Sequence, residues 1–386
     1  MDADQFCQIA AHLMRSPAAP RYESMVRSAV QQICAEHNLP YKCDRYGNVL
    51  VRFQKGGARR PLVLAAHMDH PGFEIVRALT PKCWLARFLG GVPDAYFRPG
   101  TPVRLMTHGT SAVLGPRIGK GKEFEIRLND FHSSRGAAKS CRDSVVSSVK
   151  RSTSIRPSFA VWELEDFTIR GDQIHGRACD DLIGVASILA TLIELKRTKA
   201  KVNVIGVISR AEEIGFQGAL LVAGSRQLPK QSLVISLETS RELPPVQMGK
   251  GVIIRVGDRA STFDPAGTRF LTEVAEALAR RRRDFSFQRA LMSGGTCEAT
   301  AYQELGFQTA AVCIALGNYH NCAENRIAEE FVSIPDACGM VDLLAETARQ
   351  MGSYAKLVGK LTMRLNALRR TAVHNLSAGP RQSRRS

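Results

Sequence analysis

The sequence contains no apolar run near the roughly 20 residues that a membrane-spanning helix needs. Its ten cysteines include no Cys-x-x-Cys pair, and several, such as Cys179 and Cys313, stand in apolar segments. These cysteines are therefore predicted to be reduced packing residues rather than a disulfide framework. The N-terminal segment also lacks the basic-then-apolar pattern of a signal peptide, so we expect a cytoplasmic protein.

Aromatic residues are scarce, at 6%, and no acidic residue follows Glu346, while the chain carries a formal net charge of +17. Such a charge suggests nucleic acid, anionic membranes or acidic substrates as partners. Nucleic-acid binders usually combine charge with a groove-reading motif or stacking aromatic residues, and neither is found here. We therefore expect the basic clusters at 280–283, 132–158 and the C-terminus to be solvated surface or disordered tail. No nucleic-acid partner and no membrane partner are predicted.

Apolar patterning predicts an α/β fold, in which a mixed-sheet sandwich is interrupted by a small β-barrel. Strand and helix patterns alternate over residues 1–72 and again over 166–355, which we take as two parts of one α/β domain. Between them, residues 73–165 contain short β-rich runs separated by Gly and Pro and form the predicted insert. Residues 356–386 are expected to be a basic, disordered tail.

Acidic and histidine residues stand at the ends of the apolar strands. Because ligands of α/β sheets bind beyond the carboxyl ends of strands, these side chains are expected to converge. The set comprises His67, Asp69, Asp180, Asp181, Glu212, Glu213, Glu238 and His320. Any one of them alone would be a helix cap or a surface acid. Together they suit two divalent ions, which take histidine nitrogen and carboxylate oxygen and promote acyl-transfer chemistry.

The motifs AAHMDHPG, GRACDDLIGVA, SRAEEIGFQGA, MGKGVIIRVGDRASTFDP, SGGTCEA and YHN occur in this order. Over roughly residues 5 to 350 the chain resembles the co-catalytic-metal aminopeptidases of the glutamyl or deblocking type, which assemble as tetrahedral particles. The resemblance implies hydrolysis of N-terminal residues from peptides, two divalent metal ions with zinc favoured over cobalt or manganese, and a homo-oligomer, expected to be a dodecamer built from dimers. It also implies that the insert serves assembly and substrate access.

Carried across by position, the resemblance assigns the first metal to His67 and Glu238 and the second to Glu213 and His320. Asp180 would bridge the two ions. The general base would be Glu212, and Asp69 would hold the second ring nitrogen of His67. In the family the peptide between the two aspartates at the bridge can be cis.

Three positions depart from the family pattern. His70 replaces an acid that many relatives carry, and we expect it to face solvent. Glu238 stands where an aspartate is usual, although a longer carboxylate can still bind a metal. Cys297 occupies another aspartate position, so no catalytic role is assigned there beyond a glycine-rich turn.

Three rival functions remain open. A related metal-dependent deacylase acting on small N-acyl substrates would use nearly the same ligands. A basic scaffold or nucleic-acid-binding protein would explain the charge but not the ligand set. A cysteine hydrolase is the weakest alternative, because no cysteine pairs recognisably with a histidine and an acid. The residue removed from the substrate is not fixed, although the basic balance favours acidic ones.

Overall fold

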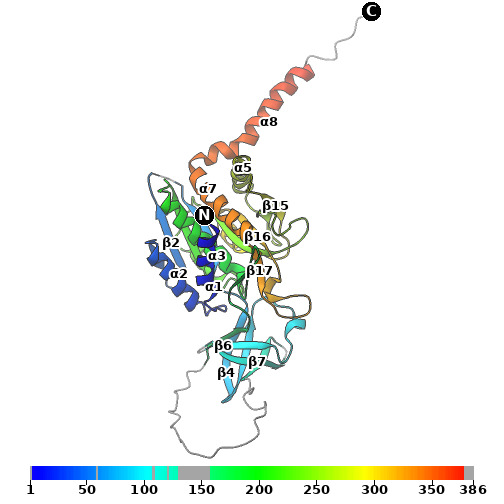
Figure 1. Cartoon of the computed structure of the whole chain (residues 1–386). Coiled ribbons are helices and arrows are strands. Elements are labelled where there is room, and N and C mark those ends of the chain that lie inside the picture. Colours follow the sequence, from blue (N-terminus) through cyan, green and yellow to red (C-terminus); the bar gives the residue numbers. More distant parts are fainter. Residues whose placement is uncertain (1, 58–59, 107–108, 120, 129–156, 378–386) are drawn as a thin grey trace, which may run out of the picture.

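The computed structural model describes residues 2–57, 60–106, 109–119, 121–128 and 157–377 of the chain. In Figure 1 a layered α/β body lies between a β-barrel at one end and a projecting helix at the other. This arrangement confirms the predicted fold class, a mixed-sheet sandwich with an inserted barrel.

The middle layer of the body is an eight-stranded sheet in the order β1-β2-β12-β3-β13-β16-β14-β15. Its central strands β12, β3, β13 and β16 run parallel to one another. They are buried over nearly their whole length, as expected for strands covered on both faces. The strands are β1 Tyr41–Cys43, β2 Val49–Gln54, β3 Leu62–His67, β12 Asn203–Ser209, β13 Leu233–Arg241, β14 Val252–Gly257, β15 Phe287–Leu291 and β16 Gln308–Leu316.

Helices cover both faces of this sheet, and successive residues of β3 alternate between them. Leu62 and Leu64 pack with the larger helical layer, whereas Val63 packs with the smaller one. The larger layer comprises α1 Ala3–Met14, α2 Ser24–Glu36, α3 Cys179–Arg197, α5 Pro265–Arg281 and α7 Ile334–Gln350. The smaller layer comprises α4 Gln217–Gly224 and α6 Glu298–Glu304.

The insert is a closed barrel in the order β4-β5-β8-β7-β6-β9. Its core is aromatic, with the ring of Phe73 edge-on to those of Phe88 and Trp162, both at 4.9 Å between centroids. Residues 129–156, which contain most of the predicted basic, serine-rich stretch, lie outside the described residues. The strands are β4 Gly72–Thr80, β5 Cys83–Leu89, β6 Pro102–Met106, β7 Thr110–Arg117, β8 Glu123–Leu128 and β9 Phe159–Trp162.

The remaining elements are short strands and 3-10 helices. A three-stranded sheet is formed by β10 Thr168–Arg170, β11 Gln173–Gly176 and β17 Glu330–Ser333. Short 3-10 helices are η1 Asp94–Tyr96, η2 Tyr319–Asn321 and η3 Met351–Ser353. The nine cysteines in the described ranges are free thiols, and Cys179 and Cys313 are buried, as predicted for packing residues.

The prediction of a disordered C-terminal tail is wrong for residues 356–377. They belong to helix α8, Tyr354–Ser377, because leucines recur at helical spacing between the basic residues. The end of the predicted tail, residues 378–386, lies outside the described residues. Within the described ranges no helix is long and apolar enough to cross a membrane.

Candidate active site

The predicted site residues lie together beyond the carboxyl ends of the central strands. His67 ends β3, Glu212 and Glu213 follow β12, and Glu238 lies within β13. Because β12, β3 and β13 are parallel neighbours, their ends meet at one edge of the sheet. His320 follows β16, the next parallel strand.

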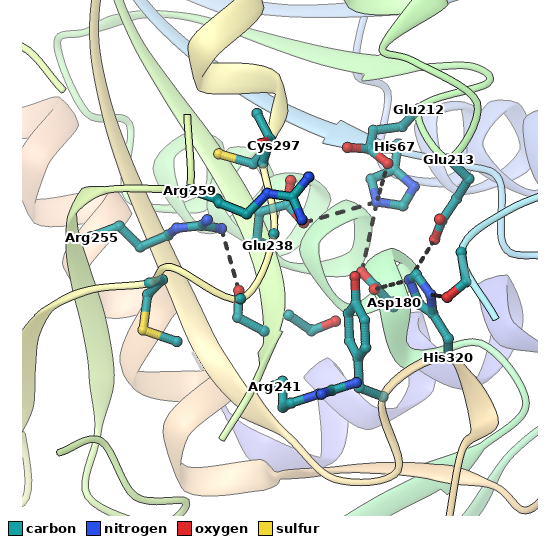
Figure 2. A pocket seen from close by; sticks show the side chains of 18 of the residues that line it. His67, Asp180, Glu212, Glu213, Glu238, Arg241, Arg255, Arg259, Cys297 and His320 are labelled. Atoms are coloured by element: carbon teal, nitrogen blue, oxygen red, sulfur yellow. Dashed lines mark hydrogen bonds and ion pairs between the residues drawn. The ribbon is translucent and has the colours of Figure 1, made fainter. Parts of the chain in front are cut away.

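Asp180, in the first turn of α3, lies between two pairs of side chains (Figure 2). Its Oδ1 is 3.6 Å from His67 Nε2, which in turn is 4.0 Å from Glu238 Oε2. Its Oδ2 is 3.6 Å from His320 Nε2, which is 3.1 Å from Glu213 Oε1. The two oxygens of one carboxylate therefore face two separate histidine–glutamate pairs.

Backbone carbonyls orient both histidines towards this centre. His67 Nδ1 lies 3.0 Å from the carbonyl oxygen of Asp69, and His320 Nδ1 lies 3.0 Å from that of Gly91 in the barrel. A carbonyl only accepts, so each Nδ1 carries a hydrogen. The opposite nitrogen, Nε2, points into the cluster and is free to bind a cation.

Carboxylates outnumber histidines in the cluster, and most of these side chains are buried away from water. Burial raises the pKa of Glu238 to about 8 and that of Glu212 well above its usual range. Burial alone would lower the pKa of His67, but Glu212, Asp180 and Asp69 outweigh it and raise that pKa well above its usual value. Strong shifts gathered in one pocket are typical of functional sites.

The donor set fits divalent cations. Asp180 Oδ1, Asp181 Oδ2 and Glu238 Oε1 are buried oxygens without a hydrogen-bond partner in the described part of the chain. Groups of three ligand atoms within 4.8 Å of one another include His67 with Asp181 and Glu238, and Asp180 with Glu213 and His320. Nitrogen and carboxylate ligands of this kind suit zinc and related ions.

The comparisons with known proteins agree with this geometry. The family described as M42 glutamyl aminopeptidase matches residues 47–329. The chain belongs to this family. It is a metal-dependent aminopeptidase, as the sequence predicted.

Solved structures share the fold of this M42 peptidase at low sequence identity. The TET1 peptidase of Pyrococcus horikoshii is 20% identical, with 89% of this chain and 99% of that one covered and a TM-score of 0.69. A TET aminopeptidase from a marine sediment archaeon of the Thaumarchaeota is 18% identical over 91% and 99% of the chains, with a TM-score of 0.72. An aminopeptidase from Desulfurococcus kamchatkensis is 21% identical over 90% and 95%, with a TM-score of 0.69.

Asp69 makes contacts in the M42 peptidase that the sequence did not predict. Its carboxylate accepts the backbone N–H groups of Glu212 and Glu213, at 2.9 and 3.1 Å. His67 is held by the Asp69 carbonyl instead, while the nearer carboxylate oxygen is 3.7 Å away. The preceding N–H, that of Ala211, donates to Glu23, a wholly buried acid next to α2. Two buried carboxylates thus fix the backbone of the glutamate pair.

The expectation that His70 faces solvent is wrong. Its side chain is 1% exposed, with Nδ1 2.7 Å from the Asp180 carbonyl and Nε2 2.9 Å from Asn321 Oδ1. Pro71 and the start of β4 follow directly, and residues 70–73 are all buried. His70 therefore holds the backbone of the aspartate at the centre of the cluster.

Sequence reasoning also missed Glu330 on β17. Its two carboxylate oxygens accept the backbone N–H groups of Asp180 at 3.0 Å and His320 at 2.8 Å. Burial raises the pKa of Glu330 well above its usual range. No spacing in the sequence links a residue to backbone groups 150 and 10 positions away, so no local signal identifies it.

The peptide between Asp180 and Asp181 is cis, as the resemblance allows.

Cys297 is buried next to the pocket, and burial raises the pKa of its thiol. A nucleophilic cysteine needs a lowered pKa, so this thiol is not suited to attack a substrate.

A cavity of about 590 Å³ opens over this cluster of histidines and carboxylates. Three arginines line it: Arg241, Arg255 and Arg259. Arg255 is 3% exposed and its Nε has no partner among the described residues. The guanidinium of Arg241 lies 5.2 Å from the ring centre of Tyr319. The cavity thus combines a carboxylate-rich end with a cationic wall.

Proposed function

We propose that the chain removes acidic N-terminal residues from peptides at a centre of two divalent ions, with zinc as the working metal. The observation that carries this proposal is the position of Asp180 between two histidine–glutamate pairs. His67 and Glu238 would hold one ion, Glu213 and His320 the other, and Asp180 would bridge them. The unpartnered oxygens of Asp180 and Glu238 suit this role. Bound there, the ions would acidify a water and polarise the scissile carbonyl.

Glu212 is the proposed general base. It lines the cavity with its Oε2 3.9 Å from His67 Nε2, the five proposed ligands leave it free to act as a base, and its backbone N–H is fixed by Asp69. Its carboxylate takes the proton of the attacking water and returns it to the leaving amine. Asp69 acts by holding this backbone in place, and its carbonyl orients the imidazole of His67.

The arginines support an acidic substrate residue. Arg255 and Arg259 lie on the cavity wall beyond Glu238, where the first side chain of a peptide would be enclosed. Guanidinium groups in a dry pocket bind carboxylates strongly. We further propose self-association into a homo-oligomer, a dodecamer by analogy with a TET neighbour solved as one, with the barrel in contacts between copies.

The two adjacent glutamates provide the test. Glu213→Gln removes a metal ligand, so bound zinc and kcat both fall, and added metal restores part of the activity. Glu212→Gln leaves bound zinc near normal while kcat for glutamyl-anilide falls at least 10²-fold, the minimum usual for loss of a general base. Zinc content by atomic absorption and kcat on glutamyl-, alanyl- and lysyl-anilides are measured for each variant.

Glu324, an exposed glutamate away from the cavity lining, gives the matched control, because Glu324→Gln should change neither quantity. A Glu212→Gln enzyme with near-native kcat would remove the base from the mechanism. Full activity after chelation would refute the metal centre, and faster cleavage of lysyl- than glutamyl-anilide would refute the acidic specificity.

A further inference from the structure

Helix α8 bears an apolar stripe that no described part of the chain covers. Leu361, Leu365 and Leu368 are 41%, 54% and 56% exposed. Their spacing of four and three residues places them on one face of the helix. Three large apolar side chains in one row on a projecting helix are unlike the scattered exposed leucines of ordinary protein surfaces.

The base of α8 is fixed to the body. Leu357 and Val358 pack against the main core, and the ring of Tyr354 lies 4.9 Å from that of Phe270 on α5. Lys360 Nζ, on α8, forms an ion pair at 2.6 Å with Glu273, which is also on α5. Beyond this point α8 leads away from the body (Figure 1). The exposed stripe therefore continues a face that is already used for packing.

Charge determines what can cover the stripe. From Tyr354 to the end of the sequence there is no acid, and the basic residues are Lys356, Lys360, Arg364, Arg369, Arg370, Arg381, Arg384 and Arg385. Arg364 and Arg369 border the stripe on its two sides, so pairing of two α8 helices would bring like charges together.

We propose that α8 docks on an anionic membrane surface. Leu361, Leu365 and Leu368 would enter the boundary between headgroups and acyl chains, while the basic residues contact lipid phosphates, as in interfacial amphipathic helices. A nucleic acid would use the charges but leave the leucines in water.

No membrane partner is expected from the sequence, because residues 356–386 are predicted there to be a disordered tail. This proposal revises that expectation. A helix lying on a surface needs no membrane span. The proposal is independent of the peptidase chemistry, because the family match ends at residue 329 and α8 contributes nothing to the cavity lining.

Vesicle flotation of the full-length protein tests the proposal. Vesicles containing about 30 mol % phosphatidylserine should carry the protein, whereas pure phosphatidylcholine vesicles should not, and binding should weaken as salt rises. A triple variant, Leu361→Gln with Leu365→Gln and Leu368→Gln, should bind at least tenfold more weakly. So should Arg364→Gln with Arg369→Gln, which removes the two arginines that border the stripe.

Met363→Gln is the matched control, since Met363 is 56% exposed on the opposite side of α8 and should be dispensable. Helix content by circular dichroism and peptidase activity show whether each variant remains folded. Equal binding to both vesicle types, or no loss in the leucine variant, would overturn the proposal. A lower particle mass on truncation after Lys360 would assign α8 to contacts between copies instead.

Discussion

Glu298 is an acid that folding places in a dry environment without a charged partner. It is wholly buried at the start of α6, where the hydroxyl of Ser209 donates to it. Burial raises its pKa to about 7 from a usual value of 4.5. The folded chain therefore holds this proton to higher pH than the unfolded chain. Between these two values, rising pH favours the unfolded state.

In the metal-free protein, the free energy of unfolding is expected to fall between about pH 5 and pH 8, because the raised pKa values of Glu298 and Glu238 act in the same direction. Glu298→Gln should remove about 3 kcal/mol of this decline. Guanidinium unfolding of chelated protein at both pH values measures it. Glu304→Gln, exposed at the other end of α6, is the control. Equal slopes for Glu298→Gln and the parent chain would contradict the assignment.

At the scale of elements, β17 has a role beyond its ladder hydrogen bonds with β11. Through Glu330 it fixes the first turn of α3 relative to the loop after β16. These two segments supply Asp180 and His320, which lie on either side of the proposed second ion. The distance between the two ligands is thus set by a strand that contributes no ligand itself.

Glu330→Gln should weaken metal binding. A glutamine side chain offers one acceptor oxygen, so the backbone N–H of either Asp180 or His320 loses its partner. Loss of such outer contacts typically costs 10–100-fold in metal affinity. Competition titration with a zinc chelator measures the affinity, and the free energy of unfolding of the metal-free protein separates this effect from general destabilisation. Glu329→Gln, at the neighbouring half-buried position, should bind zinc normally. Unchanged affinity in Glu330→Gln would show that β17 does not position the ligands.

These contacts define what the sequence could and could not predict. His67, Glu213 and His320 were predictable because each follows an apolar strand, and parallel strands end at one edge. Glu330, His70 and Glu23 were not, because they act on backbone groups that only the folded chain brings near them. α8 was missed because its basic residues outweighed the helical spacing of its leucines. Asp69 was assigned to the site, but the sequence could not distinguish its carbonyl from its carboxylate as the partner of His67.

At the scale of the whole molecule, we expect the particle mass to be near twelve times 42.3 kDa. This number follows the proposed assembly, which rests on analogy with a TET neighbour solved as a dodecamer. Light scattering at micromolar concentration measures the mass. Truncation after Lys360 should leave it unchanged. A monomeric mass would contradict the assembly without affecting the proposed site.

Two hydrogen bonds join the region of the barrel to the segment around His320. Gly91, in the loop after β5, accepts a hydrogen bond from His320, and the hydroxyl of Tyr96 donates to the carbonyl of Ala323 at 2.6 Å. A force on the barrel is therefore transmitted to the imidazole that would bind the second ion. If copies meet through the barrel, subunit association and metal occupancy would be coupled, and each would change the affinity of the other by the same factor. Diluting the particle would then change how tightly it holds its metal, and removing the metal would change, in the same sense, how tightly the copies associate.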